Sequence, residues 1–221
     1  MLDFGFYNMD CMEGMKQFPD GYFDLAIVDP VYGDVTTGGY MSNNADGLVE
    51  QTKYHTAIWK QPKTPPEYFT ELFRVSKNQI IWGGNYFVEA INKNSPCWIV
   101  WDKENTGRFA DCELAWTSFS TAVRKFKFRW NGMLQENMKN KEIRIHPTQK
   151  PVALYEWLLN RYAKPGDKII DTHVGSASSL VACHNLGFEC VGFEIDPEYY
   201  QMSLARLNDV KSQTSIFDYI T

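Results

Sequence analysis

The chain has 221 residues, of which 44% are hydrophobic and 22% are charged, and its formal net charge at pH 7 is −5. This composition is typical of an ordinary globular protein, so it excludes intrinsic disorder and a uniformly basic nucleic-acid coat. A chain of this length can bury one sizeable core. We therefore predict a single domain over residues 1–221, with an inserted or appended recognition segment.

The sequence also argues against a membrane location and against a metal site. No uninterrupted apolar segment approaches the roughly 20 residues that cross a bilayer. The N-terminus carries Asp3 and Asp10 in place of the basic start of a signal sequence. The five cysteines are odd in number and form no Cys-x-x-Cys pair. We expect a cytoplasmic protein with reduced thiols, without a membrane partner and without a bound metal.

In the first half of the chain, strand and helix patterns alternate. The apolar run 23–28 stops at Asp29-Pro30, where the backbone must leave a sheet, and this predicts a buried parallel strand. The long polar stretch at about 33–64 predicts a mobile functional loop. The pattern then predicts a helix from Pro65-Pro66 to Val75, a strand at 79–84, a short helix at 85–91, a strand at 97–101, and a hairpin of 113–119 with 125–130.

The second half of the chain repeats the alternation more regularly. We predict a helix at 151–162, a strand at 168–171, a helix at 178–185, a strand at 190–195, and a helix to about Asn208 that Asp196 caps. Strands that alternate with helices in this way predict an α/β fold with a doubly wound, mostly parallel sheet. In such folds, ligands bind at the carboxyl ends of the strands.

Positive charge is concentrated in one part of the sequence. Residues 121–150 contain eight cations and two anions, a net charge of +6, so the remainder of the chain carries −11. Most of this stretch falls in the segment at about 103–145, which we predict to be a target-recognition segment whose cations can bind phosphate groups. Within it, Phe126 and Phe128 alternate with Lys125 and Lys127, as in a strand with one apolar and one charged face. A solvated edge strand is the alternative interpretation.

The β-α-β unit from Asp171 to Glu194 has the features of a nucleoside site. Its small-residue turn allows the backbone to approach a ligand closely, and Glu194, 23 residues after Asp171, can accept hydrogen bonds from ribose hydroxyls. Gly175 is the only glycine of the turn, which disfavours a tightly held pyrophosphate and hence a nicotinamide oxidoreductase. The unit is compatible with an adenosyl cofactor and equally with a purely structural turn.

The tetrapeptide Asp29-Pro30-Val31-Tyr32 suits the chemistry of an aromatic amine. Such an amine is a poor nucleophile because its lone pair is delocalised into the ring. The carboxylate of Asp29 and the carbonyl of Pro30 can accept hydrogen bonds from the two N–H groups of the amine. These bonds would direct the lone pair at an electrophile. Tyr32 can stack on a base that has left the helix. The alternative is a strand end with a turn proline and a core tyrosine.

These motifs together resemble the beta class of DNA amino-methyltransferases. Asp29-Pro30-Val31-Tyr32 resembles the Asp-Pro-Pro-Tyr motif of that family, and residues 146–151 match its His-Pro-Thr-Gln-Lys-Pro element. The catalytic motif precedes the cofactor turn, as in that class. Residues 8–11 are similar to its N-terminal cofactor segment, and residues 171–178 are similar to its Asp-x-Phe-x-Gly-Ser-Gly-Thr turn. The resemblance spans about residues 8–207, with a variable middle, and the chain's small size resembles solitary phage or prophage enzymes.

The resemblance implies a Rossmann-like methyltransferase fold with S-adenosyl-L-methionine as the methyl donor. It implies Asp29, Pro30 and Tyr32 as catalytic residues. It also implies a set of cofactor-binding residues: Asp10 and Cys11 at the adenine, Glu194 at the ribose, His146 and Lys150 near the donor's carboxylate, and Asp29, Asp171, His173, Gly175 and Ser176 around the pocket. A cation at Lys150 makes sense, because pairing with that carboxylate leaves the sulfonium uncompensated.

Three residues depart from the family pattern. Val31 replaces the second proline, His173 stands where the family usually has phenylalanine, and Ala177 stands where it has glycine. These changes put the affinity for the cofactor in doubt more than the type of reaction.

The expected function is methyl transfer to the exocyclic amine of a flipped adenine in double-stranded DNA, without a metal or a covalent enzyme intermediate. In the family that the sequence resembles, aspartate at the first motif position, here Asp29, usually indicates that adenine is the target base. The alternatives are the same fold acting on a cytosine amine, RNA or a protein glutamine, or a non-catalytic DNA-binding protein with a degenerate cofactor pocket. A homodimer and an accompanying restriction enzyme are both compatible with this interpretation.

Overall fold

The computed structural model describes residues 1–33, 62–104, 110–131 and 134–217. Most of the predicted loop at 33–64, and parts of the predicted recognition segment at 103–145, therefore lie outside the described residues. The described strands are β1 (Gly5–Asn8), β2 (Phe23–Val28), β3 (Ser76–Trp82), β4 (Trp98–Asp102), β5 (Cys112–Thr117), β6 (Arg124–Lys127), β7 (Trp130–Asn131), β8 (Leu134–Gln135), β9 (Lys168–Asp171) and β10 (Glu189–Glu194).

Eight of these strands form one sheet in the order β1-β10-β9-β2-β3-β5-β4-β6, and β7 pairs separately with β8. Within the large sheet, β5 is antiparallel to both of its neighbours, and all the other pairings are parallel. The mostly parallel α/β sheet predicted from the sequence is therefore confirmed.

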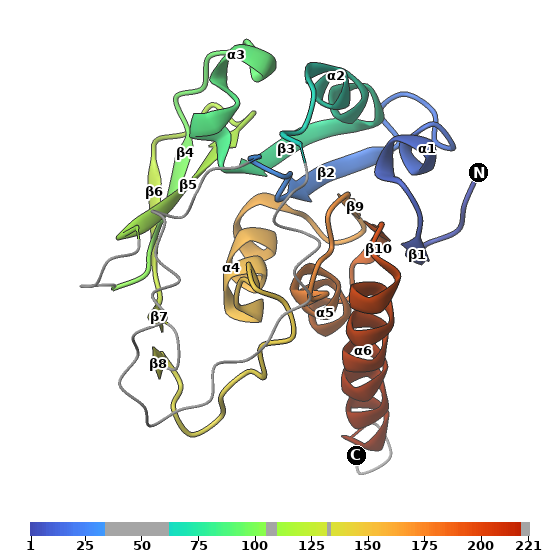
Figure 1. The fold of residues 1–221 in the computed structure, drawn as a ribbon, viewed down its shortest axis with the longest axis vertical. Helices are drawn as coiled ribbons and strands as arrows, with labels where there is room; N and C mark the ends of the chain where they lie inside the picture. The colour runs from blue at the N-terminus through green and yellow to red at the C-terminus, as the bar shows by residue number, and fades with distance from the viewer. Residues whose placement is uncertain (34–61, 105–109, 132–133, 218–221) are drawn as a thin grey trace.

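Helices cover both faces of this sheet, as Figure 1 shows. They are α1 (Cys11–Met15), α2 (Pro66–Val75), a 3-10 helix η2 (Gly84–Tyr86), α3 (Val88–Ile91), α4 (Val152–Tyr162), α5 (Ser178–Leu186) and α6 (Pro197–Phe217). The helices α1, α2 and α3 lie on one side, whereas α4, α5 and α6 lie on the other (Figure 1). The doubly wound arrangement is thus confirmed.

The central strand β2 shows why this fold needs two layers of helices. Ala26 and Val28 belong to the core cluster that includes the apolar residues of α2. Leu25 and Ile27 belong to the opposite cluster, which includes the apolar residues of α4. A strand that is apolar on both faces is stable only where both faces are covered. Among the described residues, no helix is long and apolar enough to span a membrane.

The predicted hairpin of 113–119 with 125–130 is wrong. Strand β4 lies between β5 and β6 and pairs with both of them. The physical reason is burial, since Ile99 and Trp101 of β4 are at most 1% exposed. A direct β5–β6 hairpin would leave this apolar strand at the edge of the sheet.

Other differences concern element boundaries. The short helix predicted at 85–91 is divided at Phe87 into η2 and α3, and Pro151 caps α4 instead of starting it. The last helix reaches Phe217 and does not end near Asn208. Its predicted cap is confirmed, because Asp196 Oδ1 accepts from the amides of Glu198 at 2.8 Å and Tyr199 at 3.1 Å.

Candidate active site

The topology of the sheet brings the motifs together at one edge. Strand β2 is parallel to β9, β9 to β10, and β10 to β1, so their carboxyl ends meet. Asp29 directly follows β2, Asp171 ends β9, Glu194 ends β10, and Asp10 follows β1 by two residues. Four acidic side chains that are far apart in the sequence therefore lie at adjoining strand ends, where open α/β sheets bind their ligands.

Both oxygens of the Asp29 carboxylate have partners within the protein. Oδ1 accepts a hydrogen bond from the Tyr32 hydroxyl, and Oδ2 forms an ion pair with the Lys150 ammonium. The Asp29 side chain is 16% exposed and the Lys150 side chain only 4%. Desolvated charges attract each other more strongly than surface charges, so this ion pair fixes the carboxylate in place.

Lys150 has a second carboxylate partner that the sequence analysis missed. Its Nζ lies 3.2 Å from Oε2 of Glu113 on β5, and the other Glu113 oxygen pairs with the Lys103 ammonium. Burial alone would raise the pKa of Glu113, but Lys150 and then Lys103 outweigh burial and lower this pKa to about 2. Burial alone would lower the pKa of Lys150, but Asp29 and Glu113 raise it. Two partly buried anions, Asp29 and Glu113, are thus balanced by two cations.

Sequence patterns carried no signal for Lys103 or Glu113. A charged residue next to apolar residues in a β-type segment is normally interpreted as solvent-facing. Glu113 reaches Lys150 only because β5 is inserted between β3 and β4. That pairing was not predicted, so this contact between residues 37 positions apart was not predictable either.

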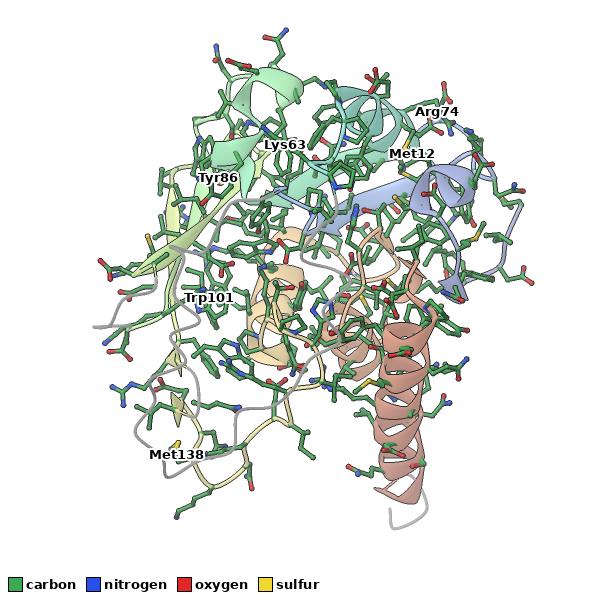
Figure 2. All side chains as sticks on the ribbon, in the orientation of Figure 1. Met12, Lys63, Arg74, Tyr86, Trp101 and Met138 are labelled. Atoms are coloured by element: carbon green, nitrogen blue, oxygen red, sulfur yellow. The ribbon has the colours of Figure 1, made fainter. Side chains whose placement is uncertain are left out.

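Tyr32 lies in an aromatic cluster built from the segment after β3. Its ring stacks on Tyr86 with a centroid distance of 5.0 Å and an interplanar angle of 24°. Phe87 meets the same ring at 6.0 Å with its plane tilted by 65°. Tyr86 is 41% exposed, and Figure 2 labels it beside the sheet. Burial, followed by the charge of Asp29, raises the pKa of Tyr32, so its hydroxyl stays a donor.

Gly83 makes room for the Tyr32 ring. A Cβ atom at position 83 would lie 2.1 Å from Cε1 of Tyr32, closer than any real contact. The φ angle of Gly83 is +64°, in the left-handed region that favours glycine. Both the backbone conformation and the space therefore require glycine here. Gly83 and Tyr86 were not identified from the sequence as site residues.

Asp171 is held inside the turn that follows β9. One of its oxygens accepts from the His173 amide at 3.0 Å, and the other accepts from the Ser179 hydroxyl. Burial raises the pKa of Asp171 to about 7. His173 contacts the Thr172 hydroxyl through Nδ1 at 2.9 Å and meets the Tyr68 ring edge-on. Burial lowers the pKa of His173 to about 4, so its ring is neutral near pH 7.

Glu194 and Gly175 are joined across two strand ends. Glu194 Oε2 accepts from the Gly175 amide at 2.9 Å, and Oε1 accepts from the Asp196 amide at 2.9 Å. Burial raises the pKa of Glu194. Each carboxylate oxygen has two lone pairs, so both oxygens keep one for a ligand. Gly175 has φ +55°, and a Cβ there would lie 3.4 Å from Nδ1 of His146.

His146 therefore lies against the same turn as Gly175. Its Nδ1 is 3.1 Å from the Thr148 hydroxyl, and its ring meets Tyr199 of α6 edge-on at 4.4 Å. Burial lowers the pKa of His146 to about 4, so this ring is also neutral near pH 7. Ser176 is buried and lies within 3.1 Å of the Ser178 hydroxyl.

Asp10 and Cys11 begin helix α1 beside the end of β10. Asp10 Oδ1 accepts from the amides of Met12 at 2.8 Å and Glu13 at 3.2 Å, which caps the helix. The Met9 amide donates to the Glu194 carbonyl at 3.1 Å, so this segment is attached to β10. Burial raises the pKa of the Cys11 thiol to about 12, so it stays uncharged.

Ala177 adopts the conformation expected of glycine. Its φ is +62°, and its side chain is fully buried among Val174, Leu180 and Leu207. An L residue in the left-handed region costs roughly 1 kcal/mol. The departure from the family's glycine at this position thus carries a backbone cost, while the turn keeps its shape.

The cationic strand β6 has the two faces predicted for it. Lys125 and Lys127 are exposed, and they lie 3.4 Å from Asp102 and 2.8 Å from Glu104 respectively. Phe126 points the other way and packs against Trp157 of α4 at 5.3 Å. The strand forms an edge of the sheet, so its cations lie on a solvent-facing rim and are partly neutralised.

Comparison with known proteins agrees with this geometry. A family model described as DNA methylase matches residues 32–205. The chain is 24% identical over 243 residues to the type II methyltransferase M.HinfI of Haemophilus influenzae, which covers 91% of this chain and 67% of that protein. It is 39% identical over 69 residues to M.HpaI of Haemophilus parainfluenzae, which covers 31% of this chain and 22% of that protein. The matches thus span about two thirds of one relative and under a quarter of the other.

Two crystal structures share the fold. The complex of M1.HpyAVI with SAM has a TM-score of 0.56 at 20% identity and covers 91% of this chain and 98% of that one. The cytosine-N4-specific PvuII DNA methyltransferase has a TM-score of 0.59 at 12% identity and covers 96% of this chain and 93% of that one. At these identities, the likeness establishes the arrangement of the sheet and its helices.

Proposed function

This chain belongs to the DNA methylase family, and from that premise we propose that it transfers a methyl group from S-adenosyl-L-methionine to the exocyclic amine of adenine in double-stranded DNA. One observation carries the proposal. Asp29, after β2, lies at the same sheet edge as the turn after β9 and the tip of β10. The residues that we propose as the amine acceptor and as the nucleoside site thus lie at adjoining strand ends.

The residues at the ends of β1, β9 and β10 fit the adenosyl part of the donor. Glu194 is fixed by two backbone amides and keeps lone pairs for ribose hydroxyls. Gly175 leaves bare backbone at the turn, and the neutral thiol of Cys11 suits an apolar purine face. When bound, S-adenosyl-L-methionine supplies an electrophilic methyl group on a sulfonium. We assign Asp10, Cys11, Asp171, Gly175, Ser176 and Glu194 to holding it.

The predicted contact of His146 and Lys150 with the donor's carboxylate stays a prediction. His146 lies against the Gly175 turn, which supports its place at the cofactor. Lys150 already contacts Asp29 and Glu113. We therefore assign Lys150 first to positioning the catalytic carboxylate.

In the proposed mechanism, Asp29 and the Pro30 carbonyl accept hydrogen bonds from the two N–H groups of the target amine. These hydrogen bonds localise the nitrogen lone pair and would direct it at the methyl group that bound S-adenosyl-L-methionine supplies. In this proposal, Asp29 receives the proton that the amine loses. Tyr32 stacks on the extruded base and offsets its unstacking, which costs a few kcal/mol.

Cytosine N4 is the second candidate acceptor. The structural likeness to the cytosine-N4-specific PvuII enzyme, with a TM-score of 0.59, favours it. Aspartate at position 29 favours adenine, and we rank adenine first on that residue. Action on RNA, a homodimer, a cytoplasmic location and an accompanying restriction enzyme stay predictions or alternatives drawn from the sequence.

The decisive experiment identifies the methylated base. Purified protein is incubated with methyl-labelled S-adenosyl-L-methionine and mixed-sequence double-stranded DNA, and the DNA is then digested to nucleosides and chromatographed. We expect the label in N6-methyl-2′-deoxyadenosine. Label in N4-methylcytosine would establish the second candidate instead. Donor binding by calorimetry without label in any base would overturn the proposed function and favour a non-catalytic DNA-binding protein.

A further inference from the structure

The ammonium of Lys150 is shared between two carboxylates. It pairs with Asp29 and lies 3.2 Å from Glu113 Oε2. The ammonium also lies over the ring of Trp82, with the ring centroid 5.4 Å from Nζ. The cation thus contacts an aromatic face and two acids.

This arrangement lowers the acceptor strength of Asp29 toward a substrate. Tyr32 and Lys150 each contact one of its two oxygens, and the ammonium offsets the charge of the carboxylate. Each oxygen keeps a second lone pair, but a target amine is bound more strongly by a carboxylate whose charge is not paired with Lys150. Moving Lys150 away would normally be costly, because a buried cation that loses its partner is strongly destabilised.

Glu113 removes that cost. Its backbone is fixed in β5, where Glu113 pairs with Trp101 of β4. Its second oxygen is anchored by Lys103, so the carboxylate cannot follow Lys150. A small shift of the ammonium across the Trp82 face replaces Asp29 by Glu113 as the partner of Lys150. The buried cation is then never left without a partner.

We propose that Glu113 is a positioning residue that takes over Lys150 when the target amine binds Asp29. This inference rests on the proposed methyl transfer to a base amine and adds a residue to that site. Lys150 holds the Asp29 carboxylate in place before the base arrives. Glu113 then allows Lys150 to leave Asp29. No covalent bond forms or breaks in this step, because Lys150 only exchanges one ion-pair partner for another.

The test compares Glu113→Gln with Glu113→Asp and wild-type protein. The measurements are the single-turnover rate of methyl transfer, the dissociation constants for donor and for DNA, and the melting temperature. Without the charge at position 113, Lys150 stays on Asp29. We expect Glu113→Gln to lower the single-turnover rate by about tenfold or more, with both dissociation constants within about threefold of wild type. Aspartate should restore most of the rate, because it keeps the charge.

Two further variants keep the inference falsifiable. Glu189→Gln, at the exposed start of β10, is the matched control and should have the wild-type rate. Lys103→Gln leaves Glu113 its charge but frees it to move, so its rate should lie below that of the wild type and above that of Glu113→Gln. If Glu113→Gln does not fold, a wild-type rate in Lys103→Gln overturns the inference. Wild-type rates in both Glu113→Gln and Lys103→Gln, or a loss confined to donor affinity, would overturn the inference while leaving the proposed function intact. If the wild-type protein methylates no base, both the inference and the proposed function are overturned.

Discussion

At the scale of single residues, the site is organised around one carboxylate. Asp29 is held by a hydroxyl from its own motif and by an ammonium 121 positions away. Neither contact involves a flexible surface partner, since Lys150 is 4% exposed. A carboxylate that is already oriented needs little rearrangement when an amine arrives, which is the main source of electrostatic catalysis.

Asp29→Asn is expected to abolish most methyl transfer. Asparagine keeps the shape of the side chain but loses the charge that polarises the amine, and its NH2 group opposes Lys150. We expect the single-turnover rate to fall by about 100-fold or more. The matched control is Asp209→Asn on the exposed side of α6, which should have wild-type activity. A comparable loss in both variants, or none in Asp29→Asn, would contradict the role of Asp29.

Gly83→Ala tests the support of the Tyr32 ring. The new Cβ would lie 2.1 Å from that ring, so the ring must move away from its stack on Tyr86. We expect a large loss of activity, together with a loss of stability of about 1–2 kcal/mol or more from the left-handed backbone. Urea unfolding and methyl transfer assays measure the two effects.

Gly187→Ala is the matched control for that substitution. Gly187 ends helix α5 with φ +72°, and an added Cβ meets nothing within 4 Å. It should therefore carry the backbone cost without the loss of activity. Equal activity in the two alanine variants would show that the position of Tyr32 is unimportant.

At the scale of elements, sequence patterns predicted the strands that are apolar on both faces. The limits of β2 were predicted correctly, and those of β9 as well, because each is a short apolar run that ends at a turn. Strand β1 was missed, because its four residues are only partly buried and show no apolar run. Local pattern predicts a strand only where burial has shaped its composition.

Pairing of strands was less predictable than their existence. The segments of β5 and β6 were recognised as β-type, but their partner is β4 in both cases. Which strands pair depends on which buried faces must be covered, and this is a property of the whole sheet. The same limit explains the site, where motif residues were predicted and Glu113, Lys103 and Gly83 were not. Their roles arise from neighbours distant in the sequence.

The edge strand β6 yields a prediction about binding to DNA. Lys125 and Lys127 are exposed on its solvent face, where they can exchange Asp102 and Glu104 for phosphates. Replacing both lysines with glutamine should weaken DNA binding and reduce the slope of log affinity against log salt by roughly 0.9 for each phosphate that is no longer neutralised. Fluorescence anisotropy at several salt concentrations measures this slope.

The control for that pair removes the same charge elsewhere. Lys77 lies at the start of β3 and Lys164 lies before β9, both at the amino ends of the strands. The double glutamine variant at these positions should bind DNA as the wild type does. An equal loss of affinity in both pairs would point to net charge and not to β6 as the cause.

At the scale of the whole molecule, three titratable groups of the site affect how stability depends on pH. The pKa values of His146 and His173 fall from 6.5 to about 4, so the unfolded chain binds their protons first. Stability therefore decreases as pH falls from about 6.5 to about 4. The pKa of Asp171 rises from 3.8 to about 7, which has the opposite sign over much of the same range. Each of the two histidines thus makes the fold more sensitive to acid, whereas Asp171 makes it less so.

His173→Phe, which restores the family's usual residue, should reduce that acid sensitivity. The loss of unfolding free energy between pH 7.5 and pH 5 should be smaller than in wild type by up to about 2 kcal/mol, because one histidine no longer titrates. Urea unfolding at the two pH values measures it. His184→Gln, at the partly exposed end of α5, should keep the wild-type dependence. An unchanged dependence in His173→Phe would contradict the neutral, buried ring.

The guanidinium of Arg206 on α6 donates to the Ser176 carbonyl at 2.7 Å, to the Ser178 hydroxyl at 3.0 Å and to Glu142 at 2.6 Å. Strand β1, at the other end of the sequence, supplies the Asn8 amide group that donates to the Glu194 carbonyl at 2.8 Å. Both flanks of the turn after β9 thus depend on segments that a ribosome makes nearly two hundred codons apart. If this turn holds the donor as proposed, a product that ends before Arg206 has no finished site for S-adenosyl-L-methionine and transfers no methyl group.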